Sequence, residues 1–322
     1  MRGDDRDTKI VKVRGRGTSM AGYHFQAGLP QLTVAGRLMG VGEAAATVSR
    51  VAGTSGAAEV RMLPERVSLD EVEAQWRRRG GGRPGQVPFG ISEVGLLPAV
   101  ADFGAAPHLL LAGNPECGLS SALRTLATSV MRAYTPEQAR IYVVDPHTSL
   151  LQVVEGPHLG RYTYREQQVR DLAKEVAAVL ETRLPPEDAT QAELAAGGRW
   201  SGPHVFVFVD NEEAVQSWDS GNIFAEDGGY PLKPLMPYVD RGKEIGFHIV
   251  VARQIGSWGR AMGSPLAGRL LQLRVPGVVM DGDRSEGPII GNVRAAEQPP
   301  GRGIYVTDKL AAPVHFAEAV QG

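Results

Sequence analysis

From Val87 onward, short apolar runs alternate with stretches of helical periodicity. The apolar runs predict strands over His108–Gly113, Arg140–Asp145, His204–Asp210, His248–Gln254, Leu270–Val275 and Gly303–Thr307. Several of them are near-continuous Val, Ile, Phe and Leu, as expected when helices cover both faces of a sheet. The alternation predicts an α/β fold with a mostly parallel, twisted sheet flanked by helices.

Two segments show the apolar spacing of amphipathic helices. The first, Ser120 to Ala133, carries one apolar face made of Leu123, Leu126, Ala127 and Val130. The second, Arg165 to Arg183, carries Val169, Leu172, Val176, Val179 and Leu180 at the same spacing. The Arg and Glu residues between them are typical of a solvated helix face.

The segment between the first predicted strand and helix has the frame of a phosphate-binding P-loop. It runs Gly113-Asn114-Pro115-Glu116-Cys117-Gly118-Leu119-Ser120-Ser121. The P-loop pattern is G-x-x-x-x-G-K-[ST], so Leu119 replaces the lysine that reaches the phosphates, and Ser120 takes the Mg²⁺-ligand position. Backbone amides and the helix N-terminus can hold an anion without a lysine. We therefore expect weakened ATP binding and slow phosphoryl transfer. Because glycine is abundant here, a Gly-rich turn without a ligand is the alternative.

A second nucleotide motif follows the predicted strand His204–Asp210, which ends in a carboxylate. This is the Walker B arrangement, in which Asp210 holds Mg²⁺ through water beside the P-loop. Many hydrolysing relatives have Glu next, but this chain has Asn211, and a neutral amide cannot accept a proton. Glu212 is a possible substitute if the turn presents it. We assign no catalytic residue.

Two arginines near the predicted strand His248–Gln254 are candidates for contacting a phosphate on a neighbouring module. They are Arg241, just before the strand, and Arg253 within it. A surface ion pair and a strand-end hydrogen bond are the simpler interpretations.

Composition limits the class of protein. The formal net charge of -2 gives no overall field for nucleic acid, although a local basic patch is still possible. The single cysteine, Cys117, excludes a disulfide framework and favours a reducing compartment. It is either a reactive thiol at a helix N-terminus or a small loop filler. No apolar run approaches the roughly 18 residues of a membrane span, and the N-terminus lacks a signal-peptide pattern. We expect a cytoplasmic chain whose membrane link comes from a partner or a missing segment.

The chain is expected to hold the end of one module followed by a complete second one. The basic, glycine-rich run Arg77–Gly85 predicts an interdomain linker; contact with nucleic acid or acidic lipid is the alternative. Gly15-Arg16-Gly17 followed by His24-Phe25 recurs as Gly301-Arg302-Gly303 followed by His315-Phe316. Because the second copy closes the α/β domain, the first is interpreted as the closing segment of a preceding module. The predicted parts are residues 1–62, a linker 63–85, and a P-loop domain 86–322.

These features together resemble the FtsK/SpoIIIE superfamily of RecA-like motors, and most of all the EccC ATPases of type VII (ESX) secretion. The resemblance rests on Leu63-Pro64-Glu65-Arg66-Val67-Ser68-Leu69, Val87-Pro88-Phe89-Gly90-Ile91, Pro107-His108-Leu109-Leu110-Leu111, Ile245-Gly246-Phe247-His248-Ile249-Val250-Val251-Ala252-Arg253 and Gly301-Arg302-Gly303. The altered positions 119 and 211 fit the downstream modules of that family, where Walker motifs are often degenerate. The resemblance implies the last ATPase module, using ATP and Mg²⁺.

In that family, the last module recognises the C-terminal signal of small WXG-type helical-hairpin substrates. The implied partners are the preceding ATPase modules, that signal and, indirectly, a membrane secretion complex; no nucleic acid is expected. A helical signal would dock by its apolar face in a groove. Apolar residues after the Walker B strand are either loop anchors or part of such a site: Trp218, Phe224, Tyr230 and Met236. The alternatives are an active protein motor, with Glu212 and a neighbour's arginine compensating, and a DNA translocase.

Overall fold

The computed structural model divides the chain into two compact units, Met1–Val60 and Arg61–Gly322. It describes residues 16–18, 24–27, 32–34, 36–52, 62–186, 188–191, 200–219, 229–256, 258–261 and 263–319. Phe224 lies outside these residues.

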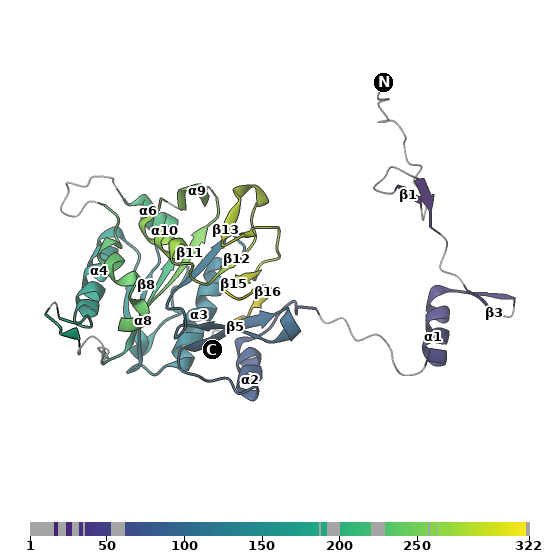
Figure 1. Ribbon diagram of the computed structural model, residues 1–322, viewed down its shortest axis with the longest axis horizontal. Coiled ribbons are helices and arrows are strands. Elements are labelled where there is room, and N and C mark those ends of the chain that lie inside the picture. The colour runs from purple at the N-terminus through teal and green to yellow at the C-terminus, as the bar shows by residue number, and fades with distance from the viewer. Residues whose placement is uncertain are drawn as a thin grey trace, which may run out of the picture. The chain divides into compact units, whose positions relative to one another are not determined.

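The described residues of the first unit form two short hairpins and one helix, at the purple end of the colour range in Figure 1. Strand β1 (Arg16–Thr18) pairs antiparallel with β2 (His24–Gln26), and β3 (Leu32–Val34) pairs antiparallel with β4 (Arg37–Met39). Helix α1 covers Val41–Ala52. It leaves Val41, Val48 and Val51 exposed, whereas Ala44 on the same helix and Met39 of β4 are buried.

The second unit is built on a ten-stranded mixed sheet with helices on both faces (Figure 1). The sheet order is β6-β5-β16-β15-β12-β7-β11-β10-β8-β9. The strands β12, β7, β11, β10, β8 and β9 are parallel, and β15, β16, β5 and β6 continue the sheet antiparallel on one side. The sheet therefore matches the expected α/β class, with an antiparallel extension that periodicity did not predict.

The sheet strands are β5 (Gln86–Ser92), β6 (Pro98–Asp102), β7 (Leu109–Gly113), β8 (Ala139–Val144), β9 (Leu159–Thr163), β10 (His204–Asp210), β11 (Phe247–Gln254), β12 (Gly277–Val279), β15 (Arg302–Val306) and β16 (Ala311–Phe316). A small hairpin joins β13 (Pro288–Ile290) to β14 (Val293–Arg294). The helices are α2 (Leu69–Arg78), α3 (Leu119–Ala133), α4 (Glu166–Glu181), α6 (Glu212–Ser217), α7 (Met236–Val239), α8 (Gly242–Ile245), α9 (Trp258–Ala261) and α10 (Pro265–Gln272). Short 3-10 turns cover Val94–Leu96, Gly156–His158, Lys233–Leu235 and Arg284–Glu286.

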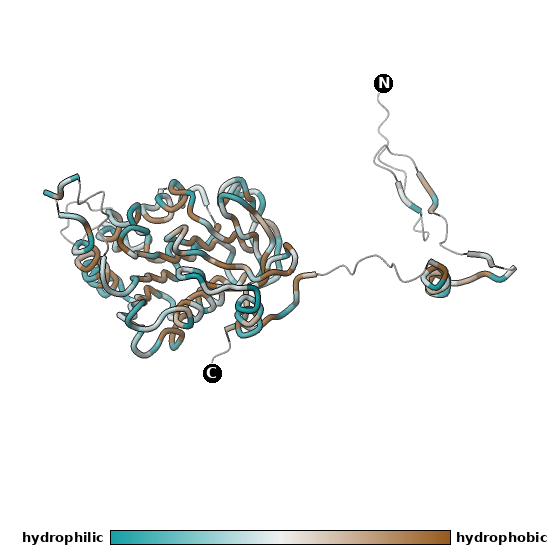
Figure 2. Tube along the Cα trace, turned by 60° about the horizontal axis from the view of Figure 1, so that its bottom comes forward, coloured by the Kyte–Doolittle hydropathy of each residue, from teal (hydrophilic) through white to brown (hydrophobic). Residues whose placement is uncertain are grey.

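Alternate residues of the central strands enter two separate hydrophobic cores. In β7, Leu110 and Ala112 face one core, and Leu109 and Leu111 face the other. The same alternation in β10 explains why its sequence is apolar throughout, since both sheet faces are buried. Figure 2 shows the apolar segments concentrated in these strands.

The two predicted helices are α3 and α4. The expected apolar face of α3 is buried along its length, as are four of the five positions expected in α4. Val179 was wrongly placed in the core: it is 37% exposed, because it lies at the edge of the stripe that Val176 and Leu180 define.

The predicted strand Leu270–Val275 was wrong. Its first residues belong to α10, which begins at the N-cap Ser264, whose hydroxyl accepts from the Ala267 amide. The strand follows as β12, Gly277–Val279. A short apolar run cannot by itself distinguish a buried strand from a buried helix end, and the Ser-Pro start signal decides it.

The segment expected to be a linker contains helix α2. Its start is fixed by a capping box between Ser68 and Glu71, and its last turn includes Arg77 and Arg78. In the glycine run after it, Gly81 has a packing role, since a Cβ there would lie 2.3 Å from Nε1 of Trp76. Within the described residues, no helix is both long and apolar enough to cross a membrane.

Candidate nucleotide site

The predicted P-loop connects β7 to α3 at the carboxyl end of the parallel strands. Gly113 ends β7 with its amide carbonyl accepting from Ile255, and a Cβ there would lie 2.5 Å from the Cys117 sulfur. Gly118 has φ +101° at the N-cap of α3, a conformation that favours glycine. The first-turn amides of α3 have no intrahelical acceptor, so they are available to an anion.

Neighbouring segments hold the loop in this shape. The Asn114 amide donates to the Asp281 carbonyl at 2.8 Å, and the Gly301 amide donates to the Cys117 carbonyl at 2.9 Å. Gly301 belongs to the recurring Gly-Arg-Gly sequence, and Arg302 beside it donates to the carbonyls of Leu63 and Pro64. The closing segment of the sheet thus fixes both the P-loop and the chain that leads into the unit.

Leu119 is partly buried and packs against the hydrophobic core beneath α3. An aliphatic side chain in this place offers no charge to a β- or γ-phosphate, whereas the lysine of the P-loop pattern would supply one. Ser120, the expected Mg²⁺ ligand, follows in the first turn of the helix and is partly buried.

Cys117 is buried, 4% exposed, beneath the loop. Burial raises the pKa of its thiol to about 11. Since the thiolate is the reactive form, this geometry favours the loop-filler interpretation of Cys117 over a reactive thiol.

The Walker B strand β10 lies two positions from β7 in the sheet, with β11 between them. Asp210 ends β10 and is 4% exposed. Its Oδ2 lies 2.6 Å from the hydroxyl of Ser149, whose oxygen is also 3.1 Å from Oδ1 of Asp145. The Walker B carboxylate is therefore tied to the loop after β8.

This second carboxylate is a residue that the sequence reasoning missed. Asp145 follows β8, is fully buried, and accepts from the Leu150 amide at 2.6 Å and the Tyr162 hydroxyl at 2.5 Å. Burial and this hydrogen bond raise the pKa of Tyr162. On the other side, Arg124 of α3 donates to the Ser149 carbonyl. The same signal that singled out Asp210, a carboxylate at the end of an apolar strand, was present at Asp145.

The two residues after Asp210 have structural roles. Asn211 is the N-cap of α6, and its side-chain oxygen accepts from the Glu213 amide at 3.1 Å. Glu212 is 0% exposed and forms an ion pair with Arg253 of β11. Glu212 also accepts from the Ser264 hydroxyl at 2.5 Å and the Tyr230 hydroxyl at 2.8 Å.

This network holds Glu212 away from solvent. Burial beside this carboxylate raises the pKa of Tyr230 well above its usual value, so the phenol stays a hydrogen-bond donor. The oxygens of this carboxylate already accept hydrogen bonds from three neighbours in a buried interior. They are therefore not positioned to accept a proton from an attacking water.

The two candidate arginines are both in ion pairs. Arg253 is 2% exposed and bound to Glu212, so it is not presented to a phosphate on a neighbouring module. Arg241 pairs with Glu244 at 3.0 Å on the surface. It precedes β11, at the opposite end of the strands from the P-loop, so any contact it makes with a phosphate would be with another molecule's nucleotide.

The residues expected as surface anchors after β10 are partly or fully buried. Tyr230 is 3% exposed, and Trp218 and Met236 pack against the core. Their environment supports the loop-anchor interpretation.

The residues present fit a Mg²⁺-nucleotide in part. The Ser120 hydroxyl and the Asp210 carboxylate supply the oxygen ligands that Mg²⁺ prefers, and the loop amides suit phosphate. The missing groups are the loop lysine and a free carboxylate after Asp210. Strand, loop, helix and strand-end carboxylate together define a P-loop ATPase fold with an altered centre.

Comparison with known proteins assigns the family. Residues 71–185 match the FtsK/SpoIIIE family. The chain is 34% identical to the ESX secretion system protein EccC of Thermomonospora curvata, over 91% of this chain and 21% of that protein. It is also 34% identical to the ESX-4 secretion system protein EccC4 of Mycobacterium tuberculosis, over 94% of this chain and 23% of the relative. The chain thus spans less than a quarter of these curated relatives.

Solved structures agree with these matches. One is Thermomonospora curvata EccC (ATPases 2 and 3) in complex with a signal sequence peptide, with a TM-score of 0.74 and 31% identity; the match covers 95% of this chain and 54% of that one. Another is described only as an ATPase, with a TM-score of 0.71 and 30% identity, covering 80% of this chain and 97% of that one. The chain belongs to the FtsK/SpoIIIE family of P-loop ATPases, and its homologues are EccC proteins of ESX secretion systems.

Proposed function

We propose that this chain is a degenerate EccC-type module that binds nucleotide weakly, hydrolyses it little or not at all, and recognises a secreted substrate. The observation that carries the first part is the environment of Glu212. This carboxylate is held in a buried ion pair with Arg253, so it does not take over the role of the glutamate that is absent at position 211.

The absence of a lysine at position 119 is an independent change, and it is also expected to slow hydrolysis. Without the lysine, the loop keeps backbone donors but no mobile cation for the phosphates. Removing one such charge stabiliser from a transition state typically costs about 10²–10³ in rate. Weak binding with slow turnover is the combined expectation.

Restoring both positions tests this part. We expect Leu119→Lys with Asn211→Glu to release phosphate from ATP faster than the unmodified chain, with Ser121→Ala as a control for changes in the loop. Equal, fast turnover by the unmodified chain and the double variant would contradict the proposal.

The recognition part rests on a groove of about 810 Å³ beside the β13–β14 hairpin. Its lining combines apolar residues with polar and charged ones: Trp258, Leu271, Val275, Ile289, Ile290, Val293 and Leu310 on the one hand, and Arg274, Asn292, Thr307, Asp308 and Lys309 on the other. Leu310 is 50% exposed at its edge, and the Trp258 indole is fixed by a 3.1 Å hydrogen bond to the Ile289 carbonyl. A groove with both apolar and charged walls suits an amphipathic helix, whose apolar face would contact the apolar residues.

The occupant we propose is the C-terminal signal of a small WXG-type helical-hairpin protein. The related structure with a signal sequence peptide supports this choice. We expect Leu310→Asp to weaken binding of such a signal peptide at least tenfold in fluorescence polarisation. The matched control is Val94→Asp, which changes an equally exposed residue, 52%, outside the groove. Equal affinity of both variants would argue against this groove.

The place of the module in a longer protein is also a proposal. Residues 1–62 are assigned as the end of a preceding module, 63–85 as a linker and 86–322 as the last ATPase domain. In support, Arg16 and Gly17 lie in β1, and Arg302 and Gly303 lie in β15. Each of these strands pairs antiparallel with the strand that carries the following His-Phe sequence, β2 and β16. The partners would be preceding ATPase modules and, through them, a secretion complex at the cytosolic face of a membrane.

A further inference from the structure

The segment that follows β8 connects the two elements that carry the expected Mg²⁺ ligands. Within it, Ser149 is partly buried. Its hydroxyl lies 2.6 Å from Oδ2 of Asp210, and its carbonyl accepts from Nε of Arg124 at 3.0 Å. Arg124 lies four residues after Ser120 on α3, so both side chains leave the same face of this helix. Ser149 therefore links the helix that carries Ser120 to the strand that carries Asp210.

The hydroxyl hydrogen of Ser149 belongs to the contact with Asp210. A hydroxyl has one hydrogen, and two carboxylate oxygens lie near it: Oδ2 of Asp210 at 2.6 Å and Oδ1 of Asp145 at 3.1 Å. Asp145 already has other donors, because it accepts from the amides of Ser149 and Leu150 and from the hydroxyl of Tyr162. The described residues give Asp210 one donor, the Ser149 hydroxyl. The shorter contact is therefore the hydrogen bond.

This hydrogen bond fixes the orientation of the Asp210 carboxylate. Because Oδ2 is bound to Ser149, rotation of the carboxylate is restricted and Oδ1 keeps one direction. No described residue donates a hydrogen bond to Oδ1. A carboxylate held through one oxygen can offer the other to a water bound to Mg²⁺, which is the role expected of Asp210.

The backbone that presents Ser149 has an uncommon conformation. Thr148, directly before it, has φ +57°, in a region that β-branched residues rarely adopt. The Thr148 amide donates to the carbonyl of Asp145 at 3.1 Å, and Asp145 is fully buried. Such conformations persist where surrounding contacts hold them, and they are concentrated at functional sites. Asp145 thus holds the turn that places Ser149 against Asp210.

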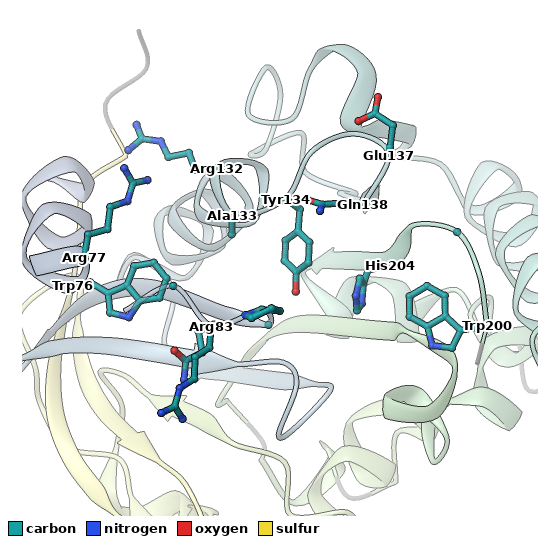
Figure 3. Close-up of a pocket in the computed structure, with 15 residues that line it drawn as sticks. Trp76, Arg77, Arg83, Arg132, Ala133, Tyr134, Glu137, Gln138, Trp200 and His204 are labelled. Carbon is teal, nitrogen blue, oxygen red and sulfur yellow. The ribbon is translucent and has the colours of Figure 1, made fainter. Parts of the chain in front are cut away.

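The opposite end of β10 has a different character. Figure 3 shows the pocket of about 560 Å³ that lies there, where His204 begins the strand. Among the described residues, its charged lining consists of Arg77, Arg83 and Arg132 with one carboxylate, Glu137. Such a lining does not suit a cation, whereas β8 and β10 are each followed or ended by a buried carboxylate at their carboxyl ends.

We propose that Ser149 is a positioning residue for the Mg²⁺ ion of a bound nucleotide: its hydroxyl orients Asp210, and Asp145 in turn fixes Ser149. The inference rests on the proposed nucleotide binding, and it adds to the site a residue outside both Walker motifs. Hydrogen-bond partners of metal-binding groups typically contribute about 10–100-fold to metal affinity. ATP binding therefore depends on Ser149 when Mg²⁺ is present and does not depend on it when Mg²⁺ is absent.

The test compares the affinity of the whole chain for ATP in Mg²⁺ and in EDTA, by calorimetry at a temperature where every variant is folded. In Ser149→Ala, the strengthening of ATP binding by Mg²⁺ is expected to fall about tenfold or to disappear, while the affinity in EDTA stays within about twofold. Ser149→Thr keeps the hydroxyl and is expected to keep most of the Mg²⁺ effect. Tyr162→Phe removes only a donor to Asp145, so a smaller loss is expected.

The matched control is Ser129→Ala. Ser129 is a buried serine of α3 whose hydroxyl donates to the Pro88 carbonyl at 2.5 Å, outside the site. Its replacement also removes a buried hydroxyl hydrogen bond, so it reproduces a loss of stability without touching Asp210. The effect of Mg²⁺ on ATP binding is expected to be unchanged in this variant.

An equal Mg²⁺ effect in Ser149→Ala and the unmodified chain would overturn the inference. An equal loss of affinity in EDTA would also overturn it, because Ser149 would then only support the fold. The same holds if Ser149→Thr or Ser129→Ala loses the Mg²⁺ effect as fully as Ser149→Ala. ATP binding that is insensitive to Mg²⁺ in the unmodified chain would overturn this inference alone, whereas no ATP binding in either condition would overturn the proposed nucleotide binding as well.

Discussion

Replacement of Glu212 by Gln tests whether this residue is structural. Glu212 and Arg253 are both almost completely excluded from solvent, at 0% and 2% exposure. Removing one charge of a buried pair costs about 3–5 kcal/mol, because the other charge is left uncompensated. The Arg253 Nε already has no hydrogen-bond partner within the described part of the chain, so little else can neutralise it.

For a unit of this size, 1 kcal/mol corresponds to about 2–4 °C in Tm. We therefore expect Glu212→Gln to lower the Tm by on the order of 10 °C, measured by calorimetry or circular dichroism. Glu213→Gln, the adjacent control on α6, is expected to change it by about 1 °C or less. Combining Glu212→Gln with Arg253→Met is expected to cost less than the sum of the single changes.

The assay for activity separates structure from catalysis. Phosphate release by folded Glu212→Gln protein, held well below its Tm, is expected to equal that of the unmodified chain. An unchanged Tm together with lost phosphate release would refute the reasoning and make Glu212 the catalytic base.

Three further predictions follow from buried groups. Burial lowers the pKa of His108 to about 4, so the unfolded chain binds the extra proton between pH 6.5 and 4. Stability is therefore lost as pH falls through that window, by about 1.4 kcal/mol per pH unit from this group, and a urea midpoint that stays constant from pH 7 to 5 would contradict it. Cys117 is expected to resist iodoacetamide at pH 8 in the folded chain and to react at the rate of a free thiol in urea; fast labelling of the folded chain would show that the loop opens. Ser149→Ala leaves the buried Asp210 with one donor fewer, so we expect the free energy of unfolding to fall by about 1–3 kcal/mol in urea titration, and no change would mean that the Ser149–Asp210 contact contributes nothing.

The sequence pattern predicted those elements whose defining residues lie in one continuous segment of the chain. The strand His204–Asp210 was predicted with its observed bounds, and the P-loop was identified because glycine spacing, a preceding strand and a following helix occur in one continuous segment. The antiparallel strands β5, β6 and β16 were not predicted. The pairing of β16 with β5 joins segments over 200 residues apart, and no local period encodes such a long-range partner. The β5–β6 pair is a local hairpin that was also not predicted.

The site was predicted in part for the same reason. The positions of Leu119 and Asn211 could be interpreted from the motif alone. The role of Glu212 depends on Arg253, Ser264 and Tyr230, which come from three different segments. Only the folded sheet brings these groups together. The sequence alone therefore could not decide whether Glu212 acts as a catalytic base.

The most direct test of the account is a calorimetric titration of the chain with ATP and Mg²⁺, with phosphate release followed on the same sample. The account predicts weak, saturable binding and phosphate release far below about 1 s⁻¹, the low end of ordinary enzymes. Tight binding with sustained turnover above that rate would contradict it, because Leu119 and the locked Glu212 would then not limit hydrolysis.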